Sequence, residues 1–263
     1  MALRSRRGLG GGEDDPDAAP GSGDGGQMSL AEHLTELRSR VIKSAVAIAA
    51  GAAVGWILYP QILDILIDPY CEILPADREC RLIVTDPLEG FSIRIKLAAY
   101  VGLVLASPVV LWQLWRFITP GLYAKEKRYA IPFVLSSIVL FLLGAALALW
   151  SFPRALEFLV QIGGQDLEPF YTPGRYLSLV TFMMLAFGVG FEFPVVLMFL
   201  QIAGVLHWRK LASWRRYAIV IIFVATAVIT PSGDPFTLLT LAIPLCLFYE
   251  ANIQIGRFIL KRP

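Results

Sequence analysis

The sequence of 263 residues has few charged side chains and few of the residues that enzymes use for catalysis. Only 17% of the residues are charged, and the chain holds two histidines and three cysteines. It contains no HExxH zinc motif, no GxxxxGK[ST] phosphate-binding loop and no GxSxG nucleophile turn. A net charge of +2 gives no basic footprint for nucleic acid. These absences predict a protein that is not an enzyme and that holds no metal or cofactor.

Long apolar stretches stand where charge is missing. Hydrophobic residues make up 56% of the chain, and its mean hydropathy of +0.63 lies above that of an ordinary soluble domain. A helix needs about 20 apolar residues to cross a hydrocarbon core about 30 Å thick. Runs such as 134–149 are uncharged and predominantly apolar rather than alternating, which favours helices over a β-barrel. We therefore predict an all-α protein in a lipid bilayer.

Six apolar segments between charges are predicted to span the membrane. They lie at about 41–59, 97–114, 132–152, 176–205, 217–229 and 236–255. Together they form a domain over 28–263, whereas residues 1–27 are rich in Gly, Pro and Asp and are predicted to be a disordered tail. Arg6 and Arg7 of this tail lack the apolar stretch that follows the arginines of an export signal. Met28 is either an alternative start or the end of the tail.

The distribution of basic residues predicts the orientation. Short loops that are rich in Lys and Arg stay in the cytoplasm. With six spans, seventeen of the 23 basic residues fall on one side of the membrane and six on the other. Both termini, and with them the tail, are therefore predicted to be cytoplasmic.

Two outer loops, about 60–96 and 153–175, carry apolar residues at helical spacing, so short helices at the membrane surface are expected there. Cys71 and Cys80 lie in the first of these loops, on the oxidising side of the membrane. They either form a local disulfide or both stay reduced. Cys246 lies inside the last span and is read as a small core residue.

Glu192 lies within the fourth span, where insertion of an ionisable side chain costs about 2.5–3.5 kcal/mol. It is therefore expected to face protein, water or a partner helix instead of lipid. Pro194 frees a backbone carbonyl and is expected to kink the helix beside it. Two interpretations stay open: a functional carboxylate, or a protonated one that is hydrogen-bonded within the bundle.

The last two spans are short. Between Arg216 and Pro231, and again between Pro235 and Glu250, lie 14 residues, which cover roughly 21 Å as helix. Either the bilayer thins around this hairpin, or the last span continues inward and Arg216 reaches toward the aqueous interface.

Two cytoplasmic segments combine acidic and apolar residues: MSLAEHLTELRSRV at 28–41 and WQLWRFITPGLYAKEKRY at 112–129. The first has an apolar stripe at helical spacing and is predicted to be an amphipathic helix that leads into the first span. An acid beside bases, such as Glu126, is usually a surface salt bridge. Two carboxylates on one face, however, match the planar guanidinium group of arginine.

These segments resemble the TatC family, the receptor subunits of the twin-arginine (Tat) protein export machinery. The matching motifs are HLTELRSR at 33–40, SPVVLWQLWRFITPGLYAKEKR at 107–128, YLSLVTFMMLAFGVGFEFPV at 176–195, TPSGDPF at 230–236 and LAIPLCLFYE at 241–250. The resemblance implies a bent, cup-like bundle of six helices in the bacterial inner membrane. It also implies a receptor that binds the Arg-Arg signal peptides of folded proteins at its cytoplasmic face, with transport driven by the proton-motive force.

The same resemblance assigns residues to two sites. The signal-peptide site comprises two acids and the motif around them: Glu36, Glu126, Arg38, Phe117, Pro120, Leu122 and Tyr123. Contacts within the membrane to the single-span subunits TatA and TatB are assigned to Glu192, Pro194, Thr230, Asp234 and Thr237. Assembly as a homo-oligomer within a larger complex is also implied.

One position departs from the family pattern. Many members carry a Ser-Gln pair near the start of the last span, where this chain has Thr237 and Leu238. A hydroxyl from Thr230, Thr237 or Thr240 would then replace the glutamine as a contact.

A proton-coupled transporter of small molecules, with Glu192 as its proton-carrying acid, is the alternative. Six spans without a visible inverted repeat, and polar signals gathered on the cytoplasmic side, argue against it.

Overall fold

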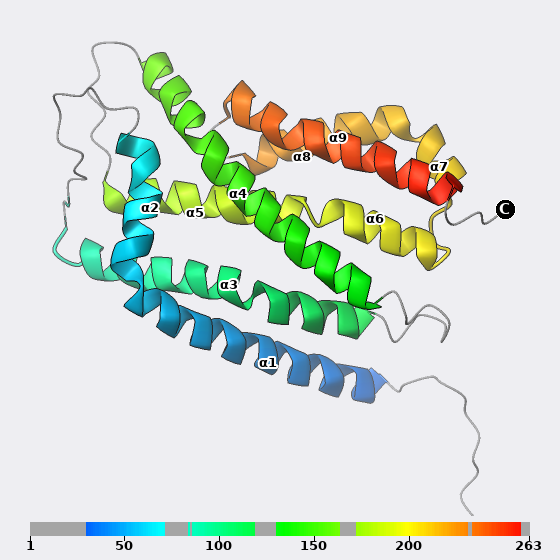
Figure 1. Cartoon of the computed structure of the whole chain (residues 1–263), viewed down its shortest axis with the longest axis horizontal. Coiled ribbons are helices and arrows are strands. Elements are labelled where there is room, and N and C mark those ends of the chain that lie inside the picture. The colour runs from blue at the N-terminus through cyan, green and yellow to red at the C-terminus, as the bar shows by residue number, and fades with distance from the viewer. Residues whose placement is uncertain are drawn as a thin grey trace, which may run out of the picture.

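The structure, a computed structural model, describes residues 30–71, 84, 86–118, 130–163, 172–230 and 233–258. Within these residues all regular secondary structure is helical. The helices are α1 (Leu30–Ile57), α2 (Tyr59–Cys71), α3 (Glu89–Ile118), α4 (Ala130–Gly163), α5 (Pro173–Gly190), α6 (Phe193–Ile202), α7 (Trp208–Ser213), α8 (Arg215–Ile229) and α9 (Pro235–Phe258) (Figure 1). The predicted all-α fold is confirmed.

Five helical segments in the described part of the chain are long and apolar enough to cross a membrane. They are His33–Ile57, Glu89–Ile118, Ile131–Ile162, Pro173–Ile202 and Pro235–Phe258. The remaining predicted span corresponds to α8, which has 15 residues and is about 22 Å long at 1.5 Å per residue. The sixth membrane helix is therefore present but short, as the spacing of Arg216 and Pro231 predicted.

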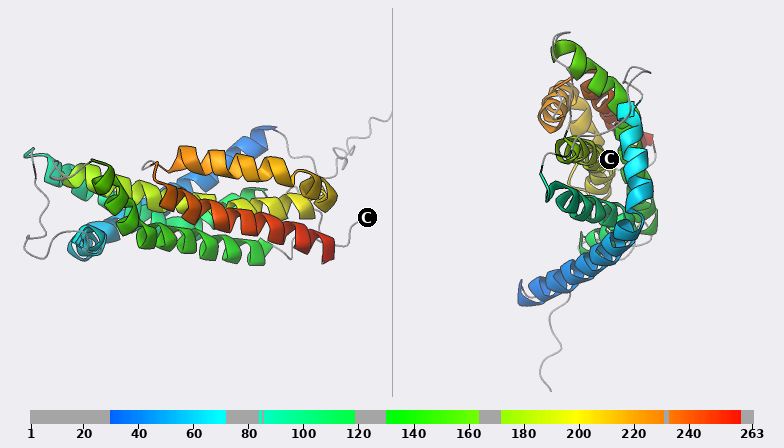
Figure 2. Two further views of the ribbon diagram at one scale, coloured as in Figure 1. Left: turned by 90° about the horizontal axis from the view of Figure 1, so that it is seen from above. Right: turned by 90° about the vertical axis from the view of Figure 1, so that its left-hand side faces the viewer.

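The long helices lie side by side in an elongated, bent bundle (Figures 1 and 2). α1 packs on α3, α4 on α5, and α8 on α9. The start of α1 lies at the same end of the bundle as α7 and the end of α9, whereas α2 lies at the opposite end (Figure 1). An even number of crossings requires this placement of the two ends.

The best-buried core lies where α4, α5 and α9 meet. Phe152, Phe187 and Leu241 are at most 1% exposed there. Outward-facing apolar side chains are left uncovered, such as Leu135 at 61% and Val228 at 80% exposed. Apolar faces of this extent are not stable in water and are expected to contact lipid. The chain is therefore a multi-pass membrane protein.

Small residues let α1 approach α3 closely. A Cβ atom built on Gly102 would lie 2.6 Å from both the Ala52 nitrogen and the Ile48 oxygen, and one built on Gly51 would lie 2.8 Å from the Gly102 oxygen. No side chain fits at such distances, so the two backbones touch only because both positions are glycine.

Two outer helices were expected, and one of them takes a different form. The apolar pattern after Tyr59 forms α2, whose Leu66 is buried and accepts a hydrogen bond at its backbone oxygen from the Tyr176 hydroxyl at 2.8 Å. The pattern after Pro153 does not form a separate helix, because α4 continues through this proline to Gly163. Phe152 and Leu156, each 1% exposed, pack into the core on both sides of Pro153. Their burial offsets the one backbone hydrogen bond that proline removes.

Candidate functional site

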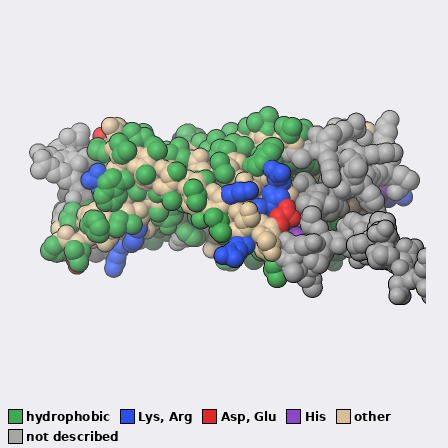
Figure 3. All heavy atoms as spheres, turned by 90° about the horizontal axis from the view of Figure 1, so that it is seen from below, with side chains coloured by type: hydrophobic (Ala, Val, Ile, Leu, Met, Phe, Trp, Pro, Cys, Tyr) green, Lys and Arg blue, Asp and Glu red, His purple; other side chains and the backbone are tan. Residues whose placement is uncertain are grey.

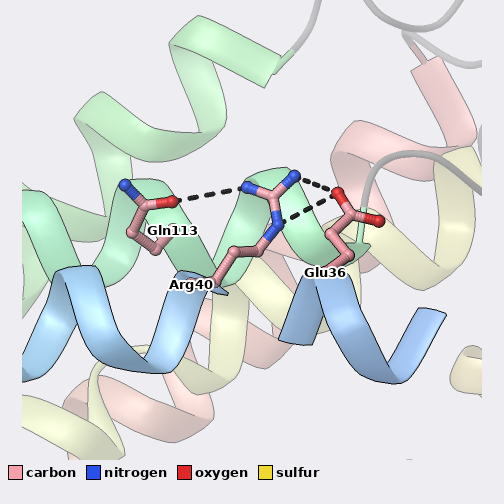
Figure 4. Close-up of polar contacts among 3 residues, drawn as sticks. All are labelled: Glu36, Arg40 and Gln113. Atoms are coloured by element: carbon pink, nitrogen blue, oxygen red, sulfur yellow. Dashed lines mark hydrogen bonds and ion pairs between the residues drawn. The ribbon is translucent and has the colours of Figure 1, made fainter. Parts of the chain in front are cut away.

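An acid and a base on α1 meet at the end of the bundle where α1 begins. Arg40 follows Glu36 by one helical turn, and its Nε donates a hydrogen bond to Glu36 Oε1 at 3.1 Å. One terminal guanidinium nitrogen donates to the same oxygen, and the other reaches Gln113 Oε1 on α3 at 3.4 Å (Figure 4). The guanidinium of Arg40 thus bridges α1 and α3 through Glu36 and Gln113.

The second oxygen of the Glu36 carboxylate takes no part in the contact with Arg40. This oxygen, Oε2, is buried and has no hydrogen-bond partner among the described residues, although 23% of the side chain is exposed. Arg38 and Lys43 are exposed nearby on α1. Basic side chains and an acidic group gather over this part of α1, while the rest of the visible face is largely hydrophobic (Figure 3). A mostly enclosed acid therefore lies beside a cationic surface.

An aromatic contact brings a second predicted site residue to the same place. The His33 ring on α1 stacks on the Phe117 ring near the end of α3, with centroids 4.5 Å apart. His33 precedes Glu36 by about one helical turn on α1, so the stacking places the Phe117 ring of α3 close to Glu36 as well. Arg38 is exposed.

Four of the predicted signal-peptide residues lie outside the described part of the chain: Pro120, Leu122, Tyr123 and Glu126. The patch of two acids therefore stays a prediction. Arg40, in contrast, was not predicted from the sequence as a site residue. It was counted only among the basic residues that predict the orientation in the membrane. Its spacing of four residues after Glu36 is the signal that could have identified it.

Within the membrane, Glu192 lies at a break between two helices. α5 ends at Gly190 and α6 begins at Phe193, with Pro194 in the first turn of α6. The Oε1 atom of Glu192 is buried and has no hydrogen-bond partner among the described residues. The Ser137 side chain on α4 lies beside this carboxyl, and it accepts a hydrogen bond from Trp115 Nε1 at 2.7 Å. Glu192 thus lies at a junction of α3, α4 and the α5–α6 break.

The polar residues of the α8–α9 hairpin cap its helices. Asp234 accepts a hydrogen bond from the Thr237 backbone nitrogen at 2.7 Å and a second from the Thr237 hydroxyl. Thr230 ends α8 and donates its hydroxyl to the Thr226 oxygen at 2.8 Å. All four side chains are at most 3% exposed. The structure brings the predicted contact residues Thr230, Asp234 and Thr237 together, and their contact with a partner subunit stays a prediction.

The cysteines fall into two groups. Cys71 at the end of α2 is disulfide-bonded, whereas Cys246 is free and partly buried in α9. Cys80 lies outside the described residues, so its pairing with Cys71 stays a prediction. In the described part of the chain, no group of three or more His, Cys, Asp or Glu side chains is placed to hold a metal ion.

Known proteins share both the sequence and the fold. The family model described as Sec-independent protein translocase protein (TatC) matches residues 32–244. The TatC protein of Aquifex aeolicus is 43% identical over 238 residues, which cover 89% of this chain and 97% of that protein. The TatC protein of Frankia casuarinae is also 43% identical, over 88% of this chain but only 66% of its own, longer sequence.

A solved structure agrees with these relatives. The crystal structure of the twin-arginine translocase receptor TatC in the detergent DDM superposes with a TM-score of 0.72 at 43% identity. The match covers 86% of this chain and 99% of that one. None of these comparisons supports the alternative of a small-molecule transporter. With a family model matched over most of its length and a fold shared at this identity, the chain belongs to the TatC family of Sec-independent protein translocases.

Proposed function

We propose that this chain is the receptor subunit of a twin-arginine protein export system and that Glu36 binds an arginine of the Arg-Arg signal peptide. One observation carries the proposal: Glu36 already holds a guanidinium group, that of Arg40, through two nitrogen donors. A carboxylate placed to accept one guanidinium is suited to accept another, because the planar fork of donors is the same.

The surroundings of Glu36 favour arginine over lysine. Its second oxygen, Oε2, has no partner among the described residues, so an incoming guanidinium has an acceptor to complete. The stacked rings of His33 and Phe117 offer a flat surface next to it, against which a guanidinium plane packs well. Glu126, on the segment after α3, is the second acid of the proposed site.

The proposed orientation places this site in the cytoplasm of a bacterium, with the chain in the inner membrane. Two observations support it. Seventeen of the 23 basic residues fall on the side of the membrane that holds Glu36, in keeping with retention of Lys and Arg in the cytoplasm. The start of α1 and the end of α9 also lie at the same end of the bundle.

The proposed partners are the single-span subunits TatA and TatB, in a complex that holds several copies of this chain and uses the proton-motive force. Glu192 supports a polar contact of this kind. Its buried Oε1 is without a hydrogen bond in the described part of the chain, at a depth where lipid offers no donor. A polar side chain on a neighbouring membrane helix would satisfy it.

Crosslinking of a signal peptide tests the receptor assignment. Membranes that contain the full chain are incubated with an Arg-Arg signal peptide carrying a photoreactive group next to the arginines. We expect Glu36→Ala to lower the crosslinking yield strongly and Glu36→Ala with Glu126→Ala to abolish it. A Lys-Lys peptide is expected to crosslink weakly to the unchanged protein.

Glu250→Ala is the matched control. Glu250 also pairs with an arginine, since it accepts a hydrogen bond from Arg215 at 2.6 Å, yet it lies on α9 rather than at the proposed site. Its loss is expected to leave crosslinking unchanged. Full crosslinking of the Glu36→Ala, Glu126→Ala variant in folded protein would disprove the assignment.

A further inference from the structure

A cavity of about 680 Å³ opens between α2 and α4, at the end of the bundle opposite Glu36. Its wall combines charged and apolar side chains. Asp68 of α2 faces it together with Arg154 and Glu157 of α4, and Ile65 and Trp150 supply apolar surface. The site described above does not include any of these residues.

The charges that line this cavity do not neutralise one another. Arg154 lies over two aromatic rings, with its guanidinium carbon 4.7 Å from the Trp150 centroid and 5.2 Å from the Phe236 centroid. Glu157 accepts one hydrogen bond, from Gln161 at 3.2 Å. Among the described residues, neither Asp68 nor Glu157 forms an ion pair with Arg154. One cation and two anions therefore share a cavity while remaining apart.

The position of the cavity along α4 is that of lipid headgroups. The apolar stretch of α4 that begins at Val134 ends at Trp150, and Arg154 follows one turn later. Trp150 is 58% exposed. An exposed tryptophan followed by an arginine is typical of the boundary between hydrocarbon and headgroups.

From this arrangement we propose that the cavity binds the headgroup of a zwitterionic aminophospholipid such as phosphatidylethanolamine. The lipid phosphate accepts hydrogen bonds from Arg154, and its ammonium group donates to Asp68 and Glu157. The acyl chains leave along Ile65 and Leu149. An anionic headgroup without an amine would meet two unpaired carboxylates, and a choline headgroup has no N–H to donate to them.

Lipid retention measured by native mass spectrometry tests the proposal. The full-length chain is purified in detergent and mixed with equal amounts of phosphatidylethanolamine, phosphatidylcholine and phosphatidylglycerol that carry the same acyl chains. We expect phosphatidylethanolamine to be retained most. Arg154→Gln is expected to lower its retention about tenfold, as for the loss of a hydrogen bond between charged groups.

Two further variants separate the roles of the charges. Asp68→Asn combined with Glu157→Gln is expected to bring retention of phosphatidylethanolamine down to that of phosphatidylcholine. Arg175→Gln, which changes an exposed arginine at the start of α5 outside the cavity, is the control and is expected to change nothing. The unfolding temperature of each variant confirms that it is folded.

Two results would overturn the proposal: equal retention of the three lipids, or equal loss of retention in Arg154→Gln and Arg175→Gln. Binding of the signal peptide is measured on the same samples and is expected to be unaffected by Arg154→Gln. A failure of the lipid site is thereby distinguished from a failure of the receptor assignment.

Discussion

Buried polar residues of two kinds occur in the part of the chain that the structure describes. Asp234 and Thr237 satisfy each other's hydrogen-bonding groups at the start of α9. Glu36 and Glu192 each keep a buried oxygen without a partner among the described residues. Since an unmet buried acceptor costs about 1–3 kcal/mol, the first pair stabilises the fold. Each of the two glutamates has an oxygen that could accept a hydrogen bond from a ligand or a partner subunit.

Removal of the Thr237 hydroxyl tests the stabilising role of the first pair. Thr237→Val keeps the shape of the side chain but takes from Asp234 one of its donors, at 0% exposure. We expect a loss of about 1–3 kcal/mol in the free energy of unfolding, measured as a lower unfolding temperature in detergent.

Thr240→Val is the control for this change, because Thr240 lies one turn further along α9 and its side chain is partly exposed. Its unfolding temperature is expected to stay close to that of the unchanged protein. Equal effects of the two substitutions would show that the Asp234–Thr237 cap does not contribute to stability.

Among the described elements, α1 depends mainly on one neighbour, α3. Most of its packing is on this helix, and only 11% of the residues in its most apolar stretch are buried. The glycines at 51 and 102 provide the close contact between the two helices. Because Arg40 of α1 and Gln113 of α3 meet across this seam at 3.4 Å, the geometry around Glu36 depends on the separation of the helices.

A single methyl group on this seam is therefore expected to disturb the site at a distance. Gly102→Ala places a Cβ 2.6 Å from the backbone of α1, which must move outward. Overpacking of this kind costs about 1–3 kcal/mol, and we expect a lower unfolding temperature together with weaker crosslinking of the signal peptide.

Gly90→Ala, on the same helix, provides the comparison, since a Cβ there meets nothing within 4 Å. It is expected to leave both measurements unchanged. Unchanged stability and crosslinking in Gly102→Ala would mean that α1 and α3 are not held as closely as described.

The prolines illustrate what the sequence could predict about the helices and what it could not. Pro194 was expected to bend the fourth span, and a break between α5 and α6 lies beside it. Pro153 was expected to end a span, yet α4 continues through it. Residues beside both prolines are buried in the core, Phe152 and Leu156 in one case and Phe191 and Val195 in the other, so the local sequence around a proline does not reveal whether the helix continues.

The candidate site was predictable to a similar degree. Glu36 and Phe117 were identified from motifs, and both lie at the same end of the bundle. Arg40 was not identified, because an arginine next to an acid is most often a surface charge. Its contact with Gln113, 73 residues further along the chain, is a tertiary contact that local patterns do not reveal.

At the scale of the whole molecule, the short α8 makes the bundle uneven in thickness. Its length of about 22 Å falls short of a hydrocarbon core of about 30 Å, whereas α9, with 24 residues, does not. Either the bilayer thins beside α8, or the end of α8 remains submerged.

We expect thinning, and labelling of the last turn of α8 tests it. Val228, at 80% exposed, is changed to cysteine in a Cys246→Ser background, and its reaction with a water-soluble maleimide is followed. If the bilayer follows the helix end, the rate stays nearly the same in bilayers of 14-carbon and 22-carbon acyl chains. Leu143→Cys, on the lipid-facing side of α4, is expected to be unreactive in both. A large fall in the Val228→Cys rate in the thicker bilayer would indicate a submerged helix end.

The contact between Arg40 and Glu36 has a kinetic consequence for the proposed receptor. An incoming arginine does not meet an empty carboxylate, because Arg40, a tethered competitor on the same helix, already holds Oε1 while Oε2 has no partner among the described residues. Such a competitor acts at a high effective concentration and cannot be diluted. The apparent affinity falls by the fraction of time that Arg40 occupies Glu36. The competition therefore slows association of the peptide, because Arg40 must leave the Glu36 oxygen that it holds before an arginine of the peptide can take its place.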